Sequence, residues 1–187
     1  MAIAVRIALA YTGKDIVVFC GYHGWHDWYM AANLGTENAL GEHLISGLNP
    51  TGVPKKLTGT AYPFRYNQLN ELKEIVSKHK NDLGVIVMES IRGDEPTEEF
   101  IEGVRAIATE IGSVLVVDEI SAGFRMNTGG AHLKLGLKTD IAVFSKALGN
   151  GYPIAAIIDK GNIMDAAQST FISSTYWTER IGPTAPH

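Results

Sequence analysis

Two charged residues in this chain stand just beyond apolar runs, and their chemistry is complementary. Asp118 follows the run 114–117, and Lys146 lies just past the run 141–144. Both runs have the length and composition of buried strands. Ligands of open α/β sheets bind outside the carboxyl ends of the strands. If these two strands are neighbours, a carboxylate and an amine face one small molecule from two sides.

Two further apolar runs end in the same way. Glu89 follows the run 85–88, and Tyr22 and His23 follow the run 16–20. If the four strands are parallel, all of these side chains lie at one edge of the sheet. A lysine at that edge can form an imine with an aldehyde, and an acid can keep a ring nitrogen protonated. Pyridoxal phosphate (PLP) needs that pair of residues.

Helices are predicted between the strands. Residues 1–11 form an apolar helix that stops at Gly13, Asn67 caps a second helix, and Thr97 caps a third that Gly112 closes. Strands separated by amphipathic helices favour βαβ units. Continuous apolar strands are typical of a parallel sheet that is covered on both faces. The predicted fold class is therefore α/β, with three α/β/α layers and a mainly parallel sheet.

The other segments give weaker signals. We expect further strands within 57–62 and at 155–158. Residues 28–56 have a weak pattern rich in Gly and Asn, which predicts a surface excursion with one short helix.

Composition excludes several functions. The chain has 16 Lys and Arg against 20 Asp and Glu and no basic cluster, which argues against nucleic acid as a partner. Cys20 is the only cysteine, which favours a reducing, cytoplasmic setting. No apolar stretch approaches the roughly 18 residues that span a bilayer, so we expect no membrane partner. His23, His26 and Asp27 form only a weak metal pattern, and we expect packing or hydrogen bonding there and no metal.

Three motifs carry a resemblance to a known family. They are Gly-Tyr-His-Gly-Trp-His at 21–26, Val-Val-Asp-Glu-Ile at 116–120 and Ser-Lys-Ala-Leu-Gly-Asn-Gly-Tyr-Pro at 145–153. Together they resemble the class III aminotransferases of PLP fold type I, and within them the glutamate-1-semialdehyde aminomutase-like branch. The resemblance covers nearly the whole chain but only the middle of a family member. It implies that residues 1–187 are a single domain, the PLP-binding large domain, without the N-terminal phosphate-binding turn and the C-terminal small domain.

The resemblance also implies roles for individual residues. Lys146 would form the Schiff base with PLP and move the substrate proton, and Asp118 would pair with the pyridine nitrogen. Tyr22 would stack on one face of the cofactor ring and Ile120 would pack on the other. The remaining residues expected around the cofactor are Glu89 as a second acid, His23, and Ser121, which stands where many relatives have glutamine near the ring hydroxyl.

One further site residue is expected from a neighbouring subunit. The segment 173–178 resembles the part of the family whose threonine reaches the phosphate bound by the partner. Thr175 is the preferred candidate over Thr178. A site shared in this way implies a homodimer.

Three functions stay open at this stage. The first is an aminotransferase that moves an amino group between an amine or amino acid and a carbonyl compound. The second is a glutamate-1-semialdehyde-type aminomutase, which uses the same lysine and aspartate. The third is a non-catalytic PLP-binding fragment, which the missing phosphate-binding turn motivates.

Overall fold

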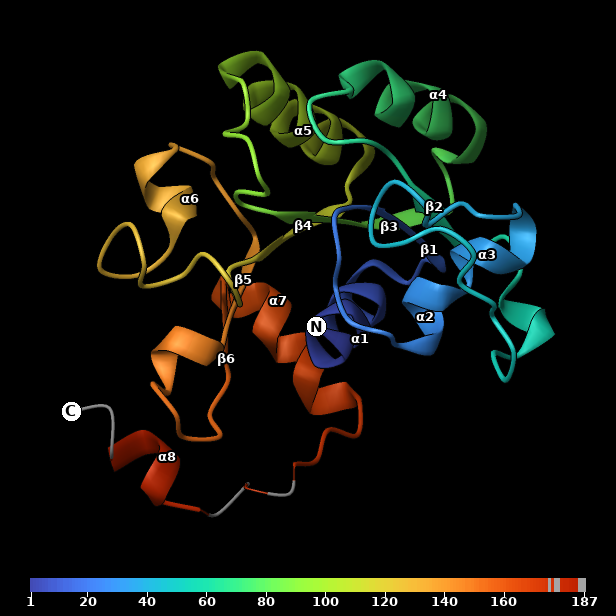
Figure 1. Cartoon of the computed structure of the whole chain (residues 1–187). Coiled ribbons are helices and arrows are strands. Elements are labelled where there is room, and N and C mark those ends of the chain that lie inside the picture. Colours follow the sequence, from blue (N-terminus) through green and yellow to red (C-terminus); the bar gives the residue numbers. More distant parts are fainter. Residues whose placement is uncertain (175, 177–178, 185–187) are drawn as a thin grey trace.

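One six-stranded sheet organises the computed structural model, which describes residues 1–174, 176 and 179–184 (Figure 1). The spatial order of the strands is β2-β1-β3-β4-β5-β6. Their bounds are β1 (Ile16–Cys20), β2 (Ala61–Pro63), β3 (Leu83–Glu89), β4 (Val114–Asp118), β5 (Ile141–Phe144) and β6 (Ala156–Asp159).

The sheet is mainly parallel, which confirms the sequence-based prediction. Every pairing among β1 to β5 is parallel, and β6 alone among the described strands runs antiparallel, to β5. The strand predicted within 57–62 is shorter than expected. Its first residue belongs instead to the 3-10 helix η1 (Lys55–Leu57), and only its end joins β2.

Helices cover both faces of the sheet, so the predicted α/β/α layers are confirmed. In Figure 1, α4 (Leu69–His79) and α5 (Glu98–Ile111) lie above the sheet, and α1 (Ala2–Thr12) and α7 (Gly161–Met164) lie below it. Successive strand residues point to opposite faces. Val85 and Val87 therefore pack in the core between the sheet and α1, whereas Ile86 packs in the core between the sheet and the helices α4 and α5.

Three of the four predicted helix-boundary residues agree with the structure, and one predicted N-cap does not. Gly13 and Gly112 end α1 and α5 in left-handed conformations, and Thr97 Oγ1 accepts the Phe100 amide at 3.2 Å. Asn67 does not cap α4, which begins after Gln68. Its backbone is left-handed (φ 61°), a conformation that asparagine tolerates, and its side chain accepts the Thr97 amide instead.

The remaining elements are short. Residues 28–56 contain more helix than the single segment predicted. The short elements are α2 (Asp27–Met30), α3 (Ala32–Gly35), α6 (Ala131–Lys134), η2 (Lys146–Leu148), η3 (Asp165–Ser169) and α8 (Ile181–Thr184). Among the described residues, no helix has both the length and the apolar character that crossing a membrane requires.

Candidate active site

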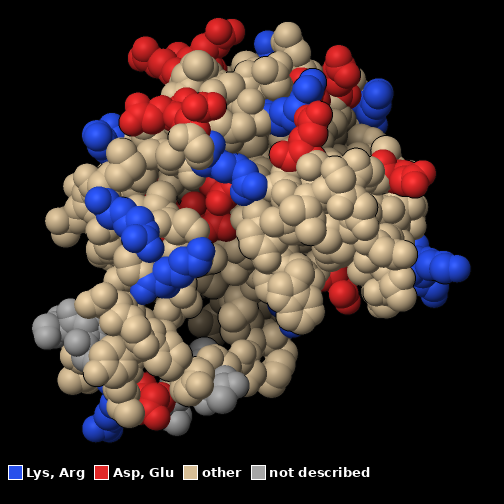
Figure 2. Space-filling view, in the orientation of Figure 1, with Lys and Arg blue, Asp and Glu red and all other residues tan. Residues whose placement is uncertain are grey.

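A cavity of about 200 Å³ lies at the carboxyl ends of β1, β3 and β4. Its position follows from the strand order, because β1 and β3 are neighbours whose connections leave toward opposite sides of the sheet, and such switch points form ligand crevices. Figure 2 shows acidic atoms near the centre of this face with Lys and Arg side chains around them. The cavity is lined by Met1, Tyr22, His23, Gly24, His26, Glu89, Asp118, Ile120, Ser121 and Lys146.

Seven of the eight residues predicted from the sequence therefore surround one cavity. They are Tyr22, His23, Glu89, Asp118, Ile120, Ser121 and Lys146. The eighth, Thr175, lies outside the described residues, as does its alternative Thr178.

Asp118 is held rigidly at the end of β4. It is 6% exposed, and its Oδ2 lies 2.9 Å from Nδ1 of the buried His23. Its Oδ1 accepts the Ile120 amide at 2.9 Å. His23 is held in turn, because its Nε2 lies 3.1 Å from the Cys20 carbonyl oxygen. A carboxylate has about four lone-pair positions, so Asp118 keeps acceptor capacity toward the cavity.

Lys146 occupies the turn between β5 and β6. Its backbone is left-handed (φ 46°), and it begins the single 3-10 turn η2. Its Nζ donates to Ser121 Oγ at 2.7 Å. The amine is therefore directed toward the segment that follows Asp118, and the two complementary groups share one cavity.

Glu89 holds the turn that carries Tyr22. Its Oε2 accepts the Tyr22 amide at 3.1 Å and pairs with Arg92 Nη1 at 2.6 Å. Gly21 allows this approach, since its φ is 111° and a Cβ there would collide with Oε2 of Glu89. Arg92 also donates to the His43 carbonyl oxygen. Glu89 thus fixes the position of Tyr22 by binding its backbone amide.

Met1, Gly24 and His26 line the cavity without having been predicted, and three further residues behind the lining were also missed by the sequence analysis. Arg92 neutralises Glu89, and the buried Glu119 pairs with His132 through Oε1 and Nδ1 at 2.7 Å. Glu119 directly follows Asp118, so its place in the motif was a usable signal. Arg92 comes from a loop and His132 from the one-turn helix α6, and no periodic pattern marks either of them.

The histidines of the turn 21–26 contact neighbouring side chains. The described residues contain no group of three potential metal ligands. His26 and His23 both stack on Trp28, with ring planes 15° and 22° apart. Burial, with a smaller contribution from the terminal amine, lowers the pKa of His26.

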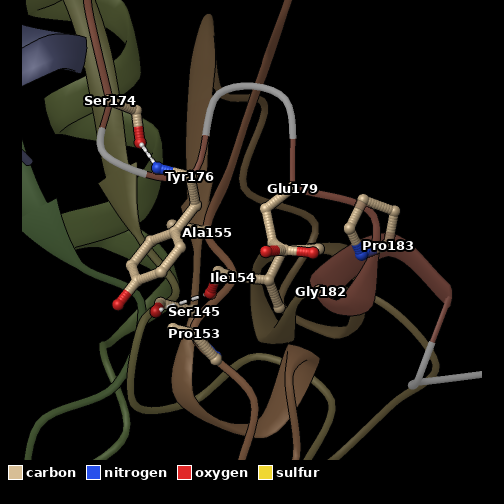
Figure 3. A pocket seen from close by; sticks show the side chains of 9 residues that line it. All are labelled: Ser145, Pro153, Ile154, Ala155, Ser174, Tyr176, Glu179, Gly182 and Pro183. Carbon is tan, nitrogen blue, oxygen red and sulfur yellow. Dashed lines mark hydrogen bonds between the residues drawn. The ribbon is translucent and has the colours of Figure 1, made fainter.

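A larger hollow of about 500 Å³ lies against Ser145 and Pro153–Ala155, which flank the turn between β5 and β6 (Figure 3). It is lined by Ser145, Pro153, Ile154, Ala155, Ser174, Tyr176, Glu179, Gly182 and Pro183. Ser145 donates through Oγ to the Ile154 carbonyl oxygen at 3.0 Å, which closes the base of the turn. Among the described residues that line it, Glu179 is the only carboxylate, and none is a lysine. The amine and carboxylate pair belongs to the smaller cavity.

Comparison with known proteins agrees with the motifs. The 3-aminobutyryl-CoA aminotransferase of Cloacimonas acidaminovorans is 37% identical over 96% of this chain and 41% of the relative. The glutamate-1-semialdehyde 2,1-aminomutase of Methanococcus maripaludis is 33% identical over 87% of this chain and 38% of the relative. A solved transaminase with PLP bound matches with a TM-score of 0.79 and 26% identity, over 94% of this chain and 42% of that one.

The chain thus spans about two fifths of the length of the relatives it matches. The class III aminotransferase family matches residues 2–183, which is nearly all of the chain. This protein belongs to the class III aminotransferases.

Proposed function

We propose that this chain is the cofactor-binding core of a PLP-dependent aminotransferase, with Lys146 as the residue that holds the cofactor covalently. The observation that carries the proposal is the cavity shared by Lys146 and Asp118. When bound, PLP supplies an electron sink that stabilises negative charge on the substrate carbon. An amino group then passes between a small-molecule amine or amino acid and a carbonyl acceptor.

The residues present fit that cofactor. Asp118 offers a buried carboxylate with spare lone pairs, which suits a protonated ring nitrogen. Tyr22 and Ile120 line the cavity and supply an aromatic and a branched apolar surface for a flat ring. Ser121 keeps the Lys146 amine within the cavity, where it can take and return a proton.

Borohydride reduction followed by peptide mass spectrometry tests the attachment. PLP is added to the purified protein, and the expected result is one modified lysine, Lys146. Lys146→Ala should abolish the modification, whereas Lys134→Ala, a control for an exposed lysine, should leave it unchanged. Modification of other lysines alone, or none in the folded protein, would contradict the proposal.

An aminomutase is the second candidate, because the aminomutase of Methanococcus maripaludis is 33% identical. Loading the protein with pyridoxamine phosphate and adding a free keto acid separates the two activities. A transaminase passes the amino group to the keto acid. An aminomutase returns it to another carbon of its own substrate. Absence of both reactions, with PLP still attached, favours the non-catalytic alternative.

We also propose the oligomeric state, the location and the partners of this protein. Residues 1–187 would form one domain of a homodimer, with Thr175 directed to the cofactor phosphate of the partner. The single cysteine and the near-balanced charge support a cytoplasmic location and small-molecule partners. Analytical ultracentrifugation tests the dimer, and a concentration-independent monomer would contradict it.

A further inference from the structure

A buried carboxylate next to the proposed site has no part in the chemistry described above. The Glu119 side chain is fully buried. Its Oε1 accepts the His132 amide and His132 Nδ1, both at 2.7 Å, and its Oε2 accepts the Ala131 amide at 3.1 Å. Burial by itself raises the pKa of Glu119, but the hydrogen bonds from His132 and Ala131 outweigh it and lower that pKa. Both oxygens of the carboxylate are thus hydrogen-bonded.

These bonds join the two ends of one loop. Residues 120–130 leave the end of β4 and return to α6 (Figure 1). The Glu119 side chain binds the first turn of α6. Neighbouring residues of an extended strand point to opposite sides. Asp118 therefore faces the cavity, and Glu119 faces the loop. The closed loop carries Ile120 and Ser121, and Ser121 accepts the Lys146 amine.

The closed loop is also packed against the strand that leads to Lys146. A Cβ at Gly123 would lie 2.7 Å from the Glu119 carbonyl oxygen and 2.7 Å from the Phe144 ring. A Cβ at Gly130 would lie 2.8 Å from Glu119 Oε1 and would also collide with the His132 ring. The His132 ring lies 6.3 Å from the Phe144 ring. Little free space therefore remains between the closed loop, Glu119 and the end of β5.

We propose that Glu119 and His132 form a latch that closes residues 120–130 and thereby positions Asp118, Ser121 and Lys146 relative to one another. Both are positioning residues, since neither lines the cavity. The inference rests on the proposed function for its effect on PLP. The closure of residues 120–130 can be measured by hydrogen exchange without any cofactor.

Glu119→Gln is the first test variant, because it keeps the side-chain size and places an amide nitrogen among hydrogen-bond donors. Hydrogen exchange in the absence of PLP should become faster in residues 120–130 and stay unchanged in β3. PLP affinity should fall about tenfold, equivalent to ~1.4 kcal/mol, with a shifted absorbance band of the bound cofactor. Glu110→Gln is the matched control, since Glu110 is exposed and pairs with Lys80 on the surface.

A second pair of variants addresses the histidine and covers the case in which Glu119→Gln does not fold. His132→Asn keeps an N–H donor near the position of Nδ1 and should retain most of the PLP affinity, whereas His132→Leu should lose it. Unchanged exchange in residues 120–130 of Glu119→Gln and His132→Leu would overturn the latch. Faster exchange with unchanged PLP affinity would overturn its positioning role. Failure of the wild type to attach PLP would contradict the proposed function and leave the exchange result standing.

Discussion

The turn after β1 depends on contacts that only one residue type allows. Gly21 adopts a φ of 111°, and its missing Cβ lets Glu89 reach the Tyr22 amide. Glu89 is in turn neutralised by Arg92. The position of Tyr22, and with it one wall of the cavity, therefore depends on a glycine that carries no chemistry itself.

Gly21→Ala should destabilise the fold and weaken PLP binding together. The backbone strain of a non-glycine residue in such a conformation costs roughly 1–3 kcal/mol, before any collision with Glu89. The control is Gly13→Ala, because Gly13 is also left-handed but a Cβ there meets nothing within 4 Å. That change should cost about 1 kcal/mol and leave PLP affinity intact. Urea denaturation and a PLP titration measure both effects, and equal results for the two variants would contradict the prediction.

The site could be predicted from sequence where its residues directly follow strands. Asp118 and Glu89 end apolar runs, so the edge of the sheet that they share follows from a parallel arrangement. Arg92 and His132 could not be predicted in this way, because the folded path of a loop and the placement of the short helix α6 determine which of many polar residues reaches a carboxylate. Their partners become identifiable only once the chain is folded.

At the level of elements, α5 has the most complete set of end signals. Thr97 caps it, and the Thr97 amide is itself bound by Asn67 at 3.0 Å. This contact explains the wrong N-cap prediction for α4. Asparagine just before a helix with an apolar stripe is typical of an N-cap. Here the Asn67 side chain instead accepts a hydrogen bond from the N-cap residue of the next long helix, α5. Propensity describes one segment at a time and does not include such a tertiary partner.

Thr97→Ala should lower the free energy of unfolding by about 1 kcal/mol, because the Phe100 amide loses its acceptor. Thr97→Ser keeps the hydroxyl and should stay close to the wild type. Chemical denaturation of the three proteins measures the difference. Equal losses for alanine and serine would show that the methyl group, and not the cap, is responsible.

For the whole molecule, buried ionisable groups make stability depend on pH. Burial, assisted by the nearby Arg92 charge, lowers the pKa of His43 to about 4. The folded state therefore favours the neutral ring, while the unfolded chain takes up a proton near pH 6.5. The stabilisation that His43 gives is complete above that pH and is lost as the pH falls through the pKa of His43 in the folded protein. At still lower pH, Glu119 and Asp140 also lose stabilisation, because their hydrogen bonds outweigh burial and lower their pKa in the folded protein.

His43→Gln should flatten this dependence. The wild type is expected to lose about 2 kcal/mol of stability between pH 7 and pH 4 through His43, and the variant should lose less over the same range, whatever its stability at pH 7. Urea midpoints at several pH values provide the measurement. A variant with the slope of the wild type would place the acid response on other groups.

The left-handed backbone of Lys146 has a consequence for how this chain can change. A non-glycine residue in that region carries a conformational cost of about 1–2 kcal/mol. Glycine at position 146 would relieve it and remove the amine at the same time. On the proposed role of Lys146, random substitution followed by selection for heat resistance alone would therefore favour variants that have lost the attachment point of PLP. A screen that also requires attachment of PLP would keep the lysine, because stability and the proposed chemistry make opposite demands on this residue.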